Sequence, residues 1–299
     1  MYALSPETIT DCKWWLKHLS DISPIFLKAT TMFITTDASD LGWGATINGK
    51  KQKGQWNTNQ KSWHCNRKEL WTVYITLKKN EMTLRGHTCL VQSDNRTVVA
   101  YLQKQGGTKS LTLLRMTRAI FLLADQLNIT INAKYIPGRY NATADSLSRH
   151  QELPEWSLSN SVTDMIFNKW GTPEIDLFAS ARSRVVKKYA TEDAQDRKAL
   201  FIDAFAKQWN WNLAWIFPPP CMMPRILCHL NTARGTYLIV CPRWHKVYWR
   251  ADLKARATAA PFTIKDLQSN LMDHRTQQPP PEVKDLQLEV WRVRGGPPK

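Results

Sequence analysis

The sequence lacks the features that mark membrane and secreted proteins. No apolar run approaches the ~20 residues of a membrane-spanning helix, and the N-terminus has no apolar signal-peptide core. None of the six cysteines forms a Cys-x-x-Cys pair. A zinc site could be assembled from Cys221, Cys228, His229, Cys241 and His245, but their spacing fits no common zinc pattern. We therefore expect an intracellular protein with reduced thiols and no membrane association.

Acidic residues are few relative to basic ones. The 299 residues include 41 Lys and Arg against 25 Asp and Glu, which gives a formal net charge of +16. Hydrophobic residues make up 43% of the chain, enough for a sizeable core, and this excludes global disorder. The length allows two ordinary domains. The basic excess favours a polyanionic partner such as nucleic acid, and the alternative is a soluble protein that is merely basic.

The first half alternates strand and helix patterns. Strands are predicted over 32–37, 43–48, 53–57, 87–93 and 129–136. Helices are predicted over 66–80, 98–102, 110–127 and 142–148. Asn48-Gly49 is a strong hairpin signal between the second and third strands. Three hairpinned strands followed by alternating helices and strands predict a mixed sheet with helices packed on it.

The rest of the chain is divided by changes in composition. Residues 1–29 are predicted to contain a lead-in helix with Trp14 and Trp15, packed on the next domain or on an upstream one. Residues 151–160 are interpreted as a linker and residues 161–255 as a second, smaller α/β domain. The proline-rich stretch from 256 to 299 is interpreted as a flexible tail.

Four acids stand at the ends of predicted elements of the first half. Each has an ordinary structural explanation: Asp37 as a turn residue, Glu69 in a helix cap, Asp94 as an N-cap, and Asp145 as a first-turn acid. Together they suit a different purpose. Four carboxylates that converge at one end of a sheet would bind two Mg²⁺ ions, which activate a water molecule and stabilise the leaving oxygen of a phosphodiester.

The motifs around these acids resemble the ribonuclease H domain of a retrotransposon reverse transcriptase. The motifs span residues 30–150 and are Thr36-Asp37-Ala38-Ser39 with Gly42-Trp43-Gly44, Arg67-Lys68-Glu69-Leu70, Gln92-Ser93-Asp94-Asn95, and Ile136-Pro137-Gly138 with Asn141-Ala142-Thr143-Ala144-Asp145-Ser146-Leu147-Ser148-Arg149. The resemblance implies a five-stranded ribonuclease H-like sheet with Asp37, Glu69, Asp94 and Asp145 as ligands of two Mg²⁺ ions, for which Mn²⁺ can substitute. It also implies cleavage of the RNA strand of an RNA–DNA hybrid, and an upstream polymerase as partner.

Two features bear on substrate and activity. Lys104, Lys109, Arg115 and Arg118 flank Gly106-Gly107 and, with Asn95, are the expected nucleic-acid contacts, although the four cations also suit a solvated helix face. Many relatives place a mobile histidine in the loop before the last acid, whereas residues 95–144 contain no histidine. The alternative function is therefore a catalytically weak or inactive nucleic-acid-binding remnant of a retroelement polyprotein.

The second half resembles the region that follows ribonuclease H in DIRS-type tyrosine-recombinase retrotransposons, which is similar to phage-type DNA adenine methyltransferases. The matching residues are Glu174-Ile175-Asp176-Leu177-Phe178-Ala179, Ile202-Asp203-Ala204-Phe205 with Trp209, Phe217-Pro218-Pro219-Pro220 and Cys241-Pro242-Arg243-Trp244. The active family pattern is Asn-Pro-Pro followed by an aromatic residue. Here Phe217 stands in place of the Asn and Pro220 in place of the aromatic residue. No glycine-rich methyl-donor loop is evident. The resemblance therefore implies a methyltransferase-like domain without methyl transfer.

Overall fold

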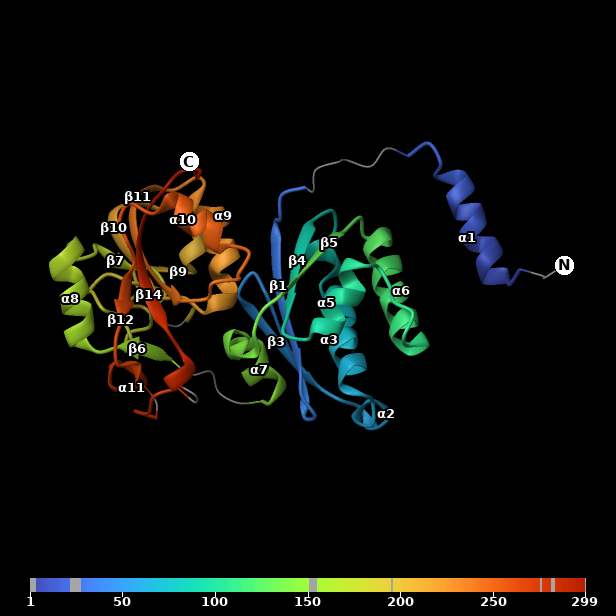
Figure 1. Cartoon of the computed structure of the whole chain (residues 1–299), viewed down its shortest axis with the longest axis horizontal. Coiled ribbons are helices and arrows are strands. Elements are labelled where there is room, and N and C mark those ends of the chain that lie inside the picture. The colour runs from blue at the N-terminus through green and yellow to red at the C-terminus, as the bar shows by residue number, and fades with distance from the viewer. Residues whose placement is uncertain are drawn as a thin grey trace.

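Two halves, each built on a five-stranded sheet, lie side by side in the computed structural model (Figure 1). The structure describes residues 4–21, 28–150, 155–194, 196–274, 276–280 and 283–298. None of the described helices has the length and apolar character needed to cross a membrane. The sheets fix the positions of the candidate site residues.

The first sheet has the strand order β3-β2-β1-β4-β5. Its strands are β1 (Met32–Ala38), β2 (Gly42–Ile47), β3 (Lys50–Gln55), β4 (Thr88–Ser93) and β5 (Thr130–Tyr135). The first three form an antiparallel meander, while β4 and β5 run parallel to β1. The predicted mixed five-stranded sheet is therefore confirmed.

Helices cover both faces of this sheet. The elements are α2 (Thr58–Lys61), α3 (Cys65–Lys79), α4 (Glu81–Leu84), α5 (Arg96–Gln103), α6 (Leu111–Gln126), the 3₁₀ turn η1 (Gly138–Tyr140) and α7 (Ala142–Ser148). Ile34 and Val91 of the sheet share one core with Leu70 and Val73 of α3. The helix α7 lies on the opposite face, toward the second half (Figure 1).

A glycine in β2 allows α7 to approach the sheet. A Cβ atom on Gly44 would lie only 2.3 Å from the carbonyl oxygen of Ala144 in α7. A side chain at this position would therefore force α7, and Asp145 with it, away from β2. The Gly-Trp-Gly motif thus has a packing role in bringing the last acid toward the others.

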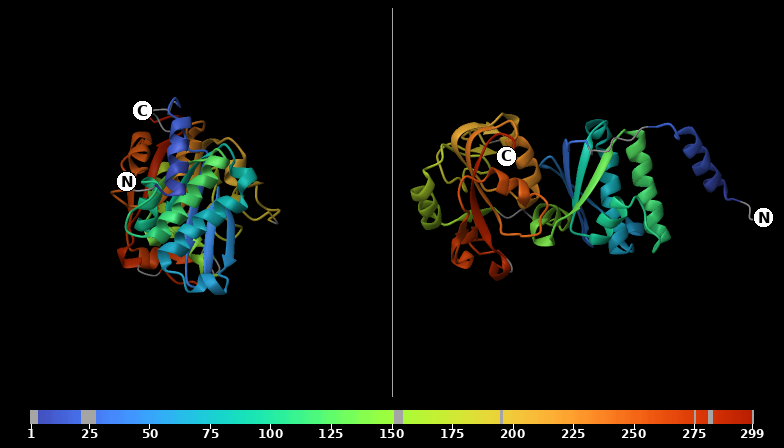
Figure 2. Two further views of the ribbon diagram at one scale, coloured as in Figure 1. Left: turned by 90° about the vertical axis from the view of Figure 1, so that its right-hand side faces the viewer. Right: turned by 45° about the horizontal axis from the view of Figure 1, so that its top comes forward.

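The N-terminal helix α1 (Pro6–Lys17) forms as predicted but does not pack on the sheet domain. Ser5 caps it by accepting the N–H of Thr8, and none of its residues is buried. Trp14 and Trp15 are 47% and 65% exposed. Figure 2 shows α1 standing away from the first sheet, and an ion pair of 2.9 Å joins Asp11 to Arg118 of α6. Of the two placements expected for this helix, packing on the next domain is therefore not seen among the described residues, and packing on an upstream domain stays a prediction.

The second sheet has the order β12-β14-β11-β10-β7. Its strands are β7 (Ile175–Asp176), β10 (Asn210–Ile216), β11 (Arg234–Pro242), β12 (Phe262–Ile264) and β14 (Leu288–Arg294). The strands β7, β10 and β11 run parallel, and β14 is antiparallel to β11. The main helices are α8 (Asn160–Trp170), α9 (Met223–Leu230) and α10 (Arg250–Arg256).

Several short elements complete the second half. They are β6 (Trp156–Leu158), β8 (Ala190–Thr191), β9 (Phe201–Ile202), η2 (Ala204–Ala206), η3 (Pro220–Met222), α11 (Leu267–Asn270), β13 (Leu271–Asp273) and η4 (Val283–Asp285). The strand β6 lies within the interval interpreted as a linker and pairs with β13. Residues 151–154 of that interval lie outside the described residues.

The C-terminal residues differ from the expected flexible tail. The strand β14 lies between β11 and β12, and Val290 and Val293 are fully buried. The segment Leu288-Glu289-Val290-Trp291 alternates apolar and polar residues in part, which is a strand signal. The flanking prolines outweighed this signal in the sequence interpretation. The second half therefore extends from β6 to β14 and is not confined to residues 161–255.

Trp291 provides a direct test of this correction. Its side chain is 4% exposed in the core of the second half, so Trp291→Ala should lower the free energy of unfolding by about 3–5 kcal/mol. Chemical denaturation of the full chain would measure the change. The matched variant Lys284→Ala removes an exposed side chain from the same C-terminal region and should stay within about 0.5 kcal/mol of wild type. Equal, negligible effects would restore the tail interpretation.

Candidate metal centre

Three carboxylates meet at one end of the first sheet. Asp37 lies near the end of β1, Asp94 directly follows β4, and Glu69 comes from the buried face of α3. One oxygen from each lies within 4.8 Å of the others. Because β1 and β4 are parallel neighbours, their carboxyl ends reach the same edge of the sheet. The convergence predicted for these acids is therefore present for three of the four.

Asp145 lies in the first turn of α7 and is outside this group of three. Its Oδ1 accepts a hydrogen bond of 2.7 Å from Nε of Arg149. Asp145 is nevertheless close enough to act on the cluster. Burial raises the pKa of Asp94, and the negative charge of Asp145 raises it further. Asp145, the fourth predicted ligand, thus lies near the cluster and forms an ion pair with Arg149.

Two side chains from the segment around α7 hold Asp37. Ser148 Oγ donates a 2.5 Å hydrogen bond to Oδ2 of Asp37. Asn141 Nδ2 donates to the Thr36 carbonyl at 3.1 Å and to Oδ1 of Asp37 at 3.4 Å. Both residues belong to the sequence motif that contains Asp145, but the sequence reasoning gave them no role. The spacing of Ser148 three residues after Asp145 was the available signal, because such residues are neighbours on a helix.

The turn η1 approaches Asp94 closely. A Cβ atom on Gly138 would lie 2.9 Å from Oδ2 of Asp94, so a larger residue there would displace either the turn or the carboxylate. Asn141 follows η1 directly. The segment from Gly138 to Asn141 therefore contacts both strand-borne acids.

The electrostatics of the cluster suit a divalent cation. Burial raises the pKa of Asp37 to about 6 against the opposing effect of the Ser148 hydrogen bond. Burial, followed by the charges of Asp37 and Asp94, raises the pKa of Glu69 well above its usual range. Among the described atoms, Oε2 of Glu69 is buried without a hydrogen-bond partner. Closely spaced carboxylate oxygens with an unsatisfied acceptor fit a hard, oxygen-binding cation.

Four of the five predicted nucleic-acid contacts are exposed, and the fifth, Asn95, is half-buried. Lys104, Lys109, Arg115 and Arg118 are all exposed around α5 and α6, and Arg118 is the partner of Asp11. Asn95 serves as the N-cap of α5, because its Oδ1 accepts the N–H groups of Thr97 and Val98. Its Nδ2 donates to Asn66 at 2.8 Å. The role of these five residues in nucleic-acid binding stays a prediction.

Residues 28–125 match the family model described as the RNase H-like domain found in reverse transcriptase. This match contains Asp37, Glu69 and Asp94 and stops before Asp145. It covers part of the first half. No curated protein matches the chain.

Solved structures with RNase H domains resemble part of the chain. The N-terminal RNase H domain of a Mycobacterium tuberculosis protein is 19% identical, with 40% of this chain and 97% of that chain covered and a TM-score of 0.31. RNase H1 LC11, isolated from compost and solved with an RNA/DNA hybrid, is 20% identical, with 40% and 96% covered and a TM-score of 0.35. The protease–reverse transcriptase of prototype foamy virus is 17% identical, with 44% of this chain and 19% of that chain covered and a TM-score of 0.26.

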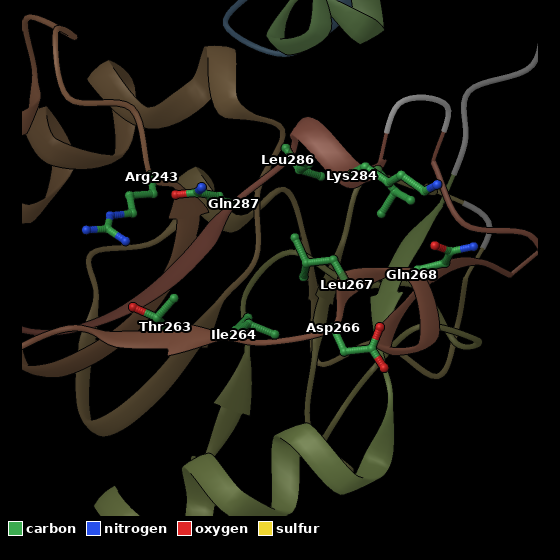
Figure 3. A pocket seen from close by; sticks show the side chains of 10 residues that line it. Arg243, Thr263, Ile264, Asp266, Leu267, Gln268, Lys284, Leu286 and Gln287 are labelled. Carbon is green, nitrogen blue, oxygen red and sulfur yellow. The ribbon is translucent and has the colours of Figure 1, made fainter.

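Two cavities of the second half lie outside this cluster. The larger has a volume of about 430 Å³ and is lined by β12, α11 and η4, with Arg243 and Lys284 on opposite sides (Figure 3). The smaller has a volume of about 10 Å³ and is lined by Asp176, Phe178, Trp215 and Phe217 among others. Neither contains any of the four predicted acids. The smaller cavity has room for about one water molecule.

Replacing Asp37 with Asn should separate stability from metal binding. A carboxyl whose pKa is raised by folding binds protons more tightly in the native state, so native stability falls as pH rises from about 4 to about 6 and stays low above that. Asp37→Asn should therefore stabilise the metal-free protein at pH 7.5 by about 1–3 kcal/mol. Thermal unfolding at pH 5.0 and 7.5, with and without Mn²⁺, would measure this.

The comparison variant is Asp125→Asn, at an exposed position of α6. It should leave both the stability and the stabilising effect of Mn²⁺ unchanged. Wild-type protein should be stabilised by Mn²⁺ more at pH 7.5 than at pH 5.0, because protons compete for the carboxylates. A destabilised Asp37→Asn protein that still responds fully to Mn²⁺ would contradict the assignment of the cluster.

Proposed function

We propose that this chain cleaves the RNA strand of RNA–DNA hybrids by metal-dependent hydrolysis, as the ribonuclease H part of a retroelement reverse transcriptase. One observation carries the proposal: the oxygens of Asp37, Glu69 and Asp94 lie within 4.8 Å of one another inside the segment that matches the RNase H-like family. An upstream polymerase is the proposed partner.

The residues of this chain have distinct roles in the proposal. Asp37, Glu69 and Asp94 hold divalent metal, with Mg²⁺ as the proposed ion, Mn²⁺ as its substitute, and two ions as the proposed number. Asp145 completes the ligand set when it is released from Arg149. When bound, such ions activate a water molecule and stabilise the leaving oxygen of the phosphodiester. Ser148 and Asn141 orient Asp37 through hydrogen bonds to its two oxygens.

Recognition of the hybrid is proposed to rest on its backbone. Lys104, Lys109, Arg115 and Arg118 supply positive charge for the phosphates, and Asn95 lies directly after Asp94. Contacts to phosphates and 2′-hydroxyl groups position a hybrid without reading its base sequence. Arg118 must leave Asp11, and this ion pair between exposed side chains costs little to break.

A nucleic-acid-binding remnant with little or no activity is the second candidate function. The observation that favours it is the 2.7 Å ion pair between Asp145 and Arg149, which leaves Asp37, Glu69 and Asp94 as the acids of the cluster. A site of this kind would retain the basic surface and lose efficient hydrolysis.

The second half is proposed to be a methyltransferase-like domain without methyl transfer. Three of the four resemblance motifs lie on or directly after the parallel strands β7, β10 and β11, and the fourth lies around β9 and η2. Phe217 follows β10 and offers no acceptor for the amino group of a base. The adjacent cavity of about 10 Å³ would not admit a nucleotide-sized methyl donor. Both observations support a role other than catalysis for this half.

Cleavage of a hybrid labelled on each strand tests the nuclease proposal. Wild-type protein with Mg²⁺ or Mn²⁺ should cut only the RNA strand. Asp94→Asn and Asp145→Asn should each lower the rate by at least about 100-fold while hybrid affinity stays within a few-fold, because the lost carboxylates bind the metal. Filter binding in EDTA would measure the affinity.

The substitution Asp125→Asn serves again as the matched control and should retain full cleavage. Cleavage of both strands, or full activity of Asp94→Asn, would refute the nuclease proposal. Salt-sensitive hybrid binding by a folded wild-type chain that never cuts would establish the remnant instead.

The proposed phosphate contacts can be tested through the salt dependence of hybrid affinity. Each Lys or Arg that neutralises a phosphate adds about one to the slope of log affinity against log salt. Arg115→Ala should therefore weaken hybrid binding and lower that slope by about 0.7–0.9. Binding titrations between 50 and about 200 mM salt would measure the slope. Arg85→Ala, which removes an exposed arginine that directly follows α4, should leave it unchanged, and the two variants behaving alike would refute the contact.

A further inference from the structure

The second half covers the sheet face that bears two of the clustered acids. Thr35 and Gln92 precede Asp37 and Asp94 by two residues, and strand side chains two apart share a face. Gln92 is 1% exposed. Its Nε2 donates to the Cys221 carbonyl at 2.8 Å, and its Oε1 accepts the Tyr248 hydroxyl at 3.1 Å. The contact between the halves therefore begins next to the metal-binding acids.

The turn that flanks the cluster is held at two points by the second half. The ring of Tyr140 stacks on Trp244, with centroids 5.3 Å apart and an interplanar angle of 29°. Arg139 Nη1 donates to the carbonyl of Asp285 at 3.1 Å. Ile136, at the end of β5, packs in the core of the second half. The segment 136–140 is thus fixed from outside its own half.

This same segment reaches the acids directly. Gly138 faces Oδ2 of Asp94, and Asn141, the next residue after Tyr140, donates to Oδ1 of Asp37. A displacement of Tyr140 would move both contacts. The path from Trp244 to the carboxylates therefore consists of one ring contact and one covalently continuous turn.

Other contacts join the halves far from this turn. Lys51 pairs with Glu192 at 2.7 Å, and Arg225 donates to the carbonyl of Asn48. Both contacts lie at the hairpin between β2 and β3. Ile47, the last residue of β2 before this hairpin, pairs with Ile34 of β1. Asp37 pairs with Gly44, toward the opposite end of the two strands. These contacts hold the halves together without touching the metal-binding end.

We propose that Trp244 of the second half is a positioning residue for the metal centre of the first half. It fixes the turn at Tyr140, so that Gly138 and Asn141 hold Asp94 and Asp37 in the arrangement that binds metal. The inference rests on the proposed metal-dependent function. It assigns the second half a mechanical part in that function and needs no chemistry from its cavities.

Mn²⁺ binding to the full chain, followed by electron paramagnetic resonance, tests this without requiring turnover. Trp244→Ala should weaken Mn²⁺ affinity by about 2- to 30-fold, the range of coupling through one packed contact. Trp244→Phe keeps an aromatic ring for Tyr140 and should restore affinity to within about two-fold. The matched control Lys51→Ala removes a contact between the halves at the far hairpin and should bind as wild type.

Hybrid cleavage gives a second readout. Trp244→Ala should lower kcat and leave the KM for hybrid within about two-fold, because the phosphate contacts are untouched. Arg139→Ala, which removes an exposed side chain and its bond to Asp285, should weaken Mn²⁺ binding in the same direction. It serves as the test if Trp244→Ala does not fold.

The outcomes separate this inference from the proposed function. Wild-type protein that binds Mn²⁺ and cleaves hybrid, with unchanged Trp244→Ala and Arg139→Ala, would overturn the inference alone. Equal weakening by Lys51→Ala would also overturn it, because the effect would then reflect general loosening of the halves. Wild-type protein that binds no Mn²⁺ would overturn both.

Discussion

Repulsion among closely spaced carboxylates is the constraint on which this end of the first sheet depends. Asp37, Glu69 and Asp94 lie within 4.8 Å of one another, and burial raises the pKa of each. Such an arrangement is unfavourable unless hydrogen bonds or a cation offset it. Ser148 and Asn141 supply hydrogen-bond donors to Asp37. The remaining unsatisfied oxygen of Glu69 marks where protein groups alone are insufficient.

This constraint explains why several elements meet at one point. The parallel pairing of β1 and β4 places two acids at one edge, and α3 supplies the third from the helical face. Gly44 lets α7 approach on the opposite face, where Ser148 reaches Asp37. The second half then packs beside α7 and contacts the turn at Tyr140. The strands and α3 thus supply the three carboxylates, and α7 and the turn at Tyr140 supply contacts that keep them in place.

Much of the first half could be predicted from the sequence, because its signals are local. The Asn48-Gly49 hairpin, the helix predicted over 66–80 and the acids at strand ends are confirmed as predicted structural features. The pairing of Asp145 with Arg149 depends on side-chain geometry that spacing does not determine. The strand β14 was missed because its neighbours in the sheet, β11 and β12, come earlier in the chain and are separated from it by proline-rich residues.

The contact between Tyr140 and Trp244 also sets an order of events during synthesis. Domains generally fold as units from the N-terminus while the chain is made. The first half can form its sheet and bring its acids together early, but Trp244 and Asp285, which fix η1, follow it in the sequence and are made later. Chains that stop before Trp244 would therefore carry the acids without the fixed turn. The arrangement of the acids thus depends on residues made after their own half.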